Sequence, residues 1–98
     1  MRLVIDKNRQ YSADYICTSA REGQRLLNEY PISVLYIGQH LDGRGTGLDV
    51  LKWAKLKNRL PLHVMLTTTY PDHRRLLSSF LRSSGYVGDG IFFHKTVH

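Results

Sequence analysis

The stretch that decides the fold runs from Val34 to Leu66 and reads VLYIGQHLDGRGTGLDVLKWAKLKNRLPLHVML. A short apolar run opens it, another closes it, and between them lie a glycine-rich turn and a segment with helical spacing. Short apolar runs that alternate with helical patterns are typical of parallel strands joined by crossover helices. This stretch therefore predicts an α/β fold.

The same alternation extends outward in both directions. Short runs rich in branched or aromatic side chains predict strands at residues 3–5, 15–17, 34–37, 63–66 and 91–93. Helices are expected between the later strands. Ser19 and Thr46 are each followed three residues later by a carboxylate, which is the spacing of a capping box. Pro71 suits the first turn of a third helix, and Gly85 is placed to end that helix with a positive φ.

The first connection is short. Only nine residues separate Ile5 from Tyr15, whereas a parallel crossover normally takes about a dozen or more and carries a helix. Either this crossover is irregular, or the second strand runs antiparallel. We expect the irregular crossover, because the strand-helix-strand rhythm that follows is regular.

Length and composition limit the possible classes of protein. The 98 residues make one domain, and 42% hydrophobic with 22% charged residues is ordinary for a globular chain. No apolar run approaches the roughly 20 residues that span a bilayer, so we expect a cytoplasmic protein without a membrane segment. Cys17, the single cysteine, is expected to be buried as a small hydrophobe.

The chain is basic. Its net charge of +6 favours an acidic partner, such as nucleic acid, a nucleotide or an acidic protein face. A solvated helix surface is the alternative explanation. The residues that would contact nucleic acid are Lys52, Lys55, Lys57, Arg59, Arg74, Arg75 and Arg82.

Two segments carry a resemblance to a known family. The turn Gly45-Thr46-Gly47 and the helix segment Val50-Leu51-Lys52-Trp53 resemble those of cyclic-phosphate processing receiver domains, and the similarity extends from Met1 to about Tyr86. Residues 31–95 also resemble the later two thirds of a response-regulator receiver domain. The resemblance implies a mostly parallel five-stranded sheet of order 2-1-3-4-5, with helices on both faces and a pocket at the carboxyl ends of the strands.

The resemblance also implies a role for single positions in that pocket. Asp6 keeps one acidic position, Lys7 replaces the second, Gly38 replaces the phosphorylated aspartate, His40 replaces a further aspartate, Thr67 or Thr68 keeps a hydroxyl, and Lys95 takes the place of a lysine. A glycine cannot accept a phosphoryl group. Because Mg²⁺ needs carboxylate ligands that these replacements remove, we expect neither a metal nor another cofactor.

The loop after the third predicted strand is a second candidate for anion binding. Its glycines precede a helix start, where backbone N–H groups can face a phosphate. An ordinary flexible connection is the alternative. With Arg44 from this loop, the expected ligand-binding set is Asp6, Lys7, Gly38, His40, Arg44, Thr67, Thr68 and Lys95.

Three functions are compatible with these patterns. The first is a receiver-like module that is not phosphorylated and binds a protein partner or a small anionic ligand. The second is a metal-independent enzyme for cyclic or diester phosphates, with His40, His94 and Lys95 as acid–base groups at neighbouring strand ends. The third is a basic nucleic-acid-binding protein. A protein interface or homodimer would use residues of the last helix and strand, namely Leu77, Phe80, Tyr86, Phe92 and Phe93.

Overall fold

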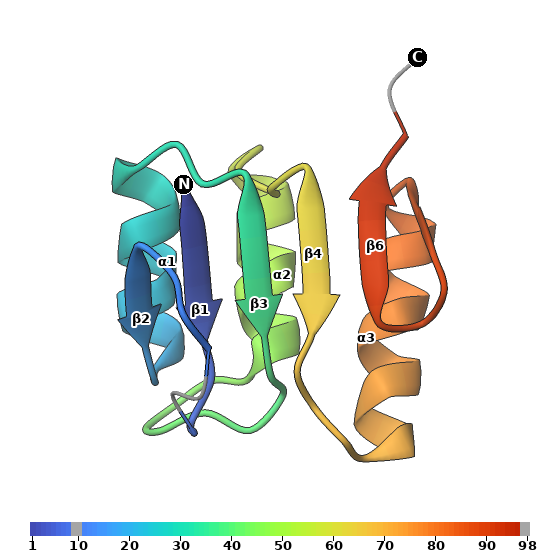
Figure 1. The fold of residues 1–98 in the computed structure, drawn as a ribbon, viewed down its shortest axis with the longest axis horizontal. Coiled ribbons are helices and arrows are strands. Elements are labelled where there is room, and N and C mark those ends of the chain that lie inside the picture. Colours follow the sequence, from blue (N-terminus) through green and yellow to red (C-terminus); the bar gives the residue numbers. More distant parts are fainter. Residues whose placement is uncertain (9–10, 97–98) are drawn as a thin grey trace.

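A six-stranded sheet forms the centre of the computed structural model, which describes residues 1–8 and 11–96 (Figure 1). The elements in chain order are β1 (Arg2–Ile5), β2 (Tyr15–Cys17), α1 (Ala20–Glu29), β3 (Val34–Ile37), α2 (Gly47–Leu56), β4 (His63–Leu66), α3 (Pro71–Ser83), β5 (Tyr86–Gly88) and β6 (Phe92–Lys95). The strands lie side by side in the order β2-β1-β3-β4-β6-β5. The predicted α/β class is confirmed, in a single compact domain.

The first four strands are parallel. β1 pairs with both β2 and β3, and β3 pairs with β4, all in the same direction. Leu3 lies beside Tyr15 on one side and beside Leu35 on the other. The short first connection is therefore an irregular parallel crossover, as expected.

The last two strands differ from the prediction. α3 carries the chain back to the side of the sheet where the parallel strands begin. β5 starts on that side and is the last strand in the sheet order, next to β6. A turn then reverses the chain, so that β6 inserts between β4 and β5 and runs antiparallel to both. Asp89 stabilises this turn by accepting the backbone N–H groups of Ile91 and Phe92, each at 2.9 Å, and Gly90 adopts a φ of +101°. The five predicted strands do lie in the order 2-1-3-4-5, as β2, β1, β3, β4 and β6. The prediction missed β5, which adds a sixth strand at the edge, and it was wrong in expecting the carboxyl end of the last strand beside those of the parallel strands.

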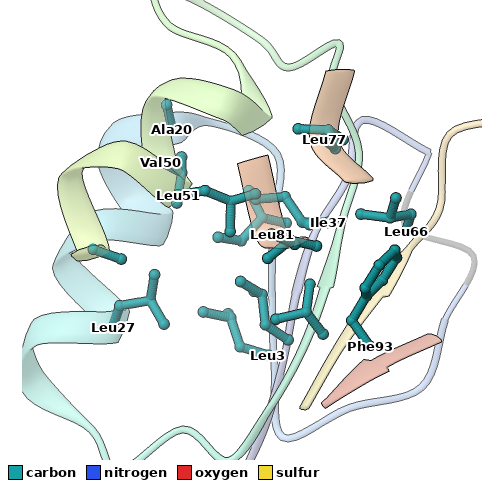
Figure 2. Packing of buried hydrophobic residues seen from close by; sticks show 14 of the residues in the cluster. Leu3, Ala20, Leu27, Ile37, Val50, Leu51, Leu66, Leu77, Leu81 and Phe93 are labelled. Atoms are coloured by element: carbon teal, nitrogen blue, oxygen red, sulfur yellow. The ribbon is translucent and has the colours of Figure 1, made fainter. Parts of the chain in front are cut away.

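All three helices pack on one face of the sheet, behind the strands in Figure 1. Alternate strand residues point to this face and form one core with the helices. The core shown in Figure 2 includes Leu3, Ile37, Leu66 and Phe93 from strands and Leu27, Val50, Leu51, Leu77 and Leu81 from helices. Right-handed crossovers place α1 and α2 on this side and send the first connection to the other side. Because that connection carries no helix in the described residues, the prediction of helices on both faces was wrong.

The helix starts follow the local signals in the sequence. The Ser19 hydroxyl accepts the N–H of Glu22 at 3.2 Å. Thr46 and Asp49 form a complete capping box, and Pro71 is the first residue of α3. Gly85, with a φ of +92°, follows the end of α3. No helix within residues 1–8 and 11–96 has the length and apolar character needed to cross a lipid bilayer.

Candidate functional site

A polar cavity of about 270 Å³ lies at the carboxyl ends of β1, β3 and β4. Its lining residues are Asp6, Lys7, Asn8, Tyr11, Gly38, Gln39, His40, Thr67, Thr68, Thr69, Tyr70 and His73. Open α/β sheets bind ligands at this edge, because the connections diverge where the strands end. The cavity is therefore the candidate binding site.

Three residues that directly follow a parallel strand form the centre of the cavity. Asp6 follows β1, Gly38 follows β3 and Thr67 follows β4. The sheet pairing continues into them, since the Gly38 N–H donates to the Ile5 carbonyl at 3.0 Å and the Thr67 N–H donates to the Ile37 carbonyl at 2.9 Å. Their positions are thus fixed by backbone hydrogen bonds that continue the sheet.

The glycine opens a small space between two polar side chains. A Cβ atom at position 38 would lie 3.0 Å from Thr67 Oγ1 and 3.4 Å from Asp6 Oδ1. Asp6 is largely buried, and its Oδ1 accepts the N–H of Asn8 at 3.3 Å. Thr67 Oγ1 is also buried, but it has no hydrogen-bond partner among the described residues. A buried hydroxyl left in that state costs about 1–3 kcal/mol, which a bound ligand or water would recover.

Two histidines form part of the wall. The rings of His40 and His73 meet edge to face with centroids 5.6 Å apart, and Tyr70 contacts His73 at 5.3 Å. Lys7 is exposed at the rim. The site therefore combines one ammonium group, two imidazoles and several hydroxyls with a single carboxylate, that of Asp6.

The connection from β4 to α3 is held by an arginine from the first turn of that helix. Arg74 Nε donates to the Thr68 carbonyl at 2.8 Å. Gln39 has a similar role on the other side, where its Oε1 accepts the N–H of Leu48 at 3.0 Å. Both contacts fix backbone segments that line the cavity.

Sequence reasoning placed Asp6, Lys7, Gly38, His40, Thr67 and Thr68 in this site, and the structure brings all six together. It missed His73, whose signal was its position three residues into the helix that follows β4. Arg44 does not line the cavity. Its loop is tied instead to the start of α1, where the Asp42 N–H donates to the Thr18 carbonyl at 2.8 Å.

His94 and Lys95 lie at the opposite edge of the sheet. His94 pairs with His63 at the beginning of β4, and the Lys95 N–H donates to the Leu62 carbonyl at 2.8 Å. The physical reason is the reversed direction of β6, which carries its carboxyl end away from those of the parallel strands. The predicted convergence of His40 with His94 and Lys95 was wrong.

Most of the predicted interface is core. Leu77, Tyr86 and Phe93 are at most 2% exposed, so a partner cannot reach them, whereas Phe92 is 58% exposed. The Tyr86 hydroxyl donates to the carbonyl of Pro61, and burial raises the pKa of Tyr86 to about 12. Phe80 is half-buried beneath the ammonium group of Lys55, which lies 5.6 Å from its ring centroid.

Comparisons with known proteins identify no relative, since no family model, curated protein or solved structure matches this chain. Within residues 1–8 and 11–96, no group of three or more His, Cys, Asp or Glu side chains is placed to hold a metal ion. The chemistry of the cavity itself is therefore the basis for a functional proposal.

Proposed function

We propose that this protein is a receiver-like module that is not phosphorylated and that binds a small phosphorylated ligand in the cavity at the carboxyl ends of β1, β3 and β4. One observation carries the proposal. The buried Thr67 hydroxyl has no partner among the described residues and lies in a cavity whose other groups are mainly donors and basic side chains. A phosphate oxygen is an acceptor suited to that hydroxyl.

The surrounding groups support an anion over a cation. Lys7 supplies a positive charge, and the imidazole N–H groups of His40 and His73 can donate to phosphate oxygens. Threonine hydroxyls at positions 67 to 69 can donate to phosphate oxygens. The carboxylate of Asp6 borders the same small space as the Thr67 hydroxyl and opposes an anion there. We therefore expect the phosphate to reach the Thr67 hydroxyl from the side of Lys7 and the histidines.

Gly38, at the centre of the cavity, explains why the proposed module does not accept a phosphoryl group. Gly38 stands where the resemblance to receivers puts the acceptor carboxylate, and glycine has no side chain to phosphorylate. The module would then respond to the concentration of its ligand and not to phosphorylation. A cytoplasmic location is part of the proposal, because one cysteine leaves no internal disulfide for an oxidising compartment to maintain.

The test is an NMR titration of the whole chain with inorganic phosphate and, separately, with a nucleoside monophosphate. Amide shifts are expected at Lys7, Gly38 and Thr67. The variants Thr67→Val and Lys7→Gln should each weaken binding about tenfold, since each removes one charged or charge-assisted contact. Lys57→Gln removes the same charge from an exposed site at the end of α2 and should leave the affinity unchanged.

Stability separates a binding role from a structural role for Thr67. Removal of an unpartnered buried hydroxyl should leave the free energy of unfolding unchanged or slightly raised, while the affinity falls. Absence of shifts up to about 10 mM of either ligand, a concentration above the range of specific sites, would contradict the proposal. Equal affinity of Thr67→Val and the parent chain would also contradict it.

A further inference from the structure

The second face of the sheet carries two rows of side chains, and none of the helices among residues 1–8 and 11–96 packs on it. One row crosses the sheet through Ile16, Val4, Tyr36, Met65 and Phe92, which are neighbours in register. The other crosses through Arg2, Val34, His63, His94 and Val87. We call these ten residues the open face, in which Val4 is fully buried and the others are exposed or half-buried. In Figure 1 it is the side toward the viewer.

The first row provides exposed aromatic surface. Phe92 is 58% exposed, and Tyr36 is half-buried with its ring held edge to face against Tyr11 at 5.7 Å. The two rings stand on strands that are two positions apart, which places them about 10 Å from each other. A hollow of about 270 Å³ lies over this part of the sheet and is lined by Tyr36, Met65 and Phe92 together with His63 and His94.

The second row provides donors, and the one carboxylate recorded in contact with it is that of Asp14, which accepts the backbone N–H of Arg2 at 2.7 Å. Arg2, His63 and His94 are all exposed, and none of the ten side chains is acidic. His63 and His94 lie opposite each other on antiparallel strands. The hydrogen bond from Lys95 N–H to the Leu62 carbonyl makes them a non-hydrogen-bonded pair, the kind whose side chains approach most closely. Their imidazoles therefore lie together beside the aromatic row.

We infer that the open face binds single-stranded nucleic acid, with bases stacked on Phe92 and Tyr36 and phosphates near Arg2, His63 and His94. Aromatic rings on a sheet surface stack unpaired bases in this way, and every base has a π-face to offer. A duplex is not suited to the site, because its bases are already stacked. The overall charge of +6 favours a polyanion.

The size of the face favours a short single strand over a second copy of this chain. Each row crosses five strands spaced about 4.8 Å apart, so the two rows together cover a flat area of roughly 300 Å². A stable protein interface usually needs about 800 Å² from each partner. A strand of three or four nucleotides covers the smaller area. This inference does not depend on the cavity at the other edge.

Fluorescence anisotropy of labelled oligouridylate and oligothymidylate of about eight nucleotides tests the inference, a length within the usual range of single-strand sites. Phe92→Ala should weaken binding about 5- to 100-fold, the loss that one stacked base produces. Leu56→Ala is the matched control, because Leu56 is 86% exposed on α2, on the other side of the sheet. It should leave the affinity unchanged. Comparison of the two oligonucleotides shows whether RNA or DNA binds better, and binding of either supports the inference.

Substitutions of the donor side chains test the position of the phosphates. The double variant His63→Gln, His94→Gln should weaken binding and should leave phosphate binding at the cavity intact. Arg75→Gln with Arg82→Gln removes two charges from α3, on the helix side, and should have a smaller effect. The inference is overturned if the α3 variant abolishes binding while Phe92→Ala does not, if a duplex binds as tightly, or if no binding appears at low salt. A dimer in light scattering that Phe92→Ala dissociates would assign the face to a second copy and would also overturn it.

Discussion

The parallel half of the sheet and its C-terminal hairpin contain strands of similar length and composition but put their polar residues to different uses. In the parallel half, three consecutive strand ends deliver Asp6, Gly38 and Thr67 to one place. In the hairpin, the turn at Asp89 sends His94 to the opposite edge, where it meets His63. Strand direction thus decides which residues share a site. It also gives the molecule two separate polar surfaces.

The largest difference between the two halves is expected in stability. Leu35 in β3 is fully buried at the centre of the core, so Leu35→Ala should lower the free energy of unfolding by about 2–5 kcal/mol. Val87→Ala in β5, where the side chain is 44% exposed, should cost less than about 1 kcal/mol. Urea denaturation of both variants measures this. Similar losses for the two would mean that the hairpin is as central to the core as β3.

Alkaline pH should loosen the attachment of the hairpin to the parallel half. Tyr86 has a folded-state pKa of about 12 and an ordinary value near 10 when unfolded. Since the unfolded chain loses this proton first, the stabilisation is complete below about pH 10 and is lost as pH rises toward 12, by roughly 2–3 kcal/mol. Denaturation at pH 8 and pH 11 should show a steeper fall for the parent chain than for Tyr86→Phe. Parallel pH profiles would contradict the assignment to Tyr86.

A larger side chain at Gly47, beside the cavity, should affect both stability and ligand binding in the parallel half. A Cβ atom at Gly47 would lie 2.1 Å from the Gly38 carbonyl oxygen, so Gly47→Ala must push the start of α2 away from the cavity. We expect a loss of about 1–3 kcal/mol in unfolding free energy. The phosphate affinity should fall as well, because Gly38 moves. Unchanged amide shifts at Gly38 and Thr67 in the variant would show that this contact does not shape the cavity.

The smallest expected effect concerns the hairpin turn. Gly90 has a φ of +101°, and no atom lies within 4 Å of the position that its Cβ would take. Gly90→Ala therefore introduces backbone strain without a clash and should cost about 1–2 kcal/mol. Phosphate binding at the other edge should stay the same. Calorimetric melting together with the phosphate titration checks both expectations, and weaker phosphate binding would mean that the two halves are coupled.

Sequence reasoning predicted the parallel half more fully than the hairpin, for a physical reason. Capping signals at Ser19, Thr46 and Pro71 are local, and so are the apolar runs of β1 to β4. The hydrophobic pattern of a strand does not indicate its direction in the sheet, because the direction depends on the turn before the strand. The pair Asp89-Gly90 between short apolar runs is a hairpin signal, and it would have revealed both β5 and the reversal of β6.

The candidate site shows the same distinction. Residues directly after a parallel strand were placed correctly, whereas Arg44 and Lys95 were assigned by position along the chain and lie elsewhere. The choice of helix face required two facts together, the handedness of crossovers and the absence of a helix among the described residues of the first connection. Resemblance to receivers suggested helices on both faces of the sheet. Which residues reach the site, and which face of the sheet the helices cover, follows only from the three-dimensional path of the chain.

The short connection between β1 and β2 also has a consequence for protein engineering. Tyr11 in this connection lies against Tyr36 of the open face, and lengthening a loop adds little closure entropy. An amphipathic helix inserted there would pack against the row from Ile16 to Phe92 and bury it. The two-layer domain would become a three-layer one without any change in its strands. The length of this one loop thus determines whether the sheet can carry a helix layer on its second face.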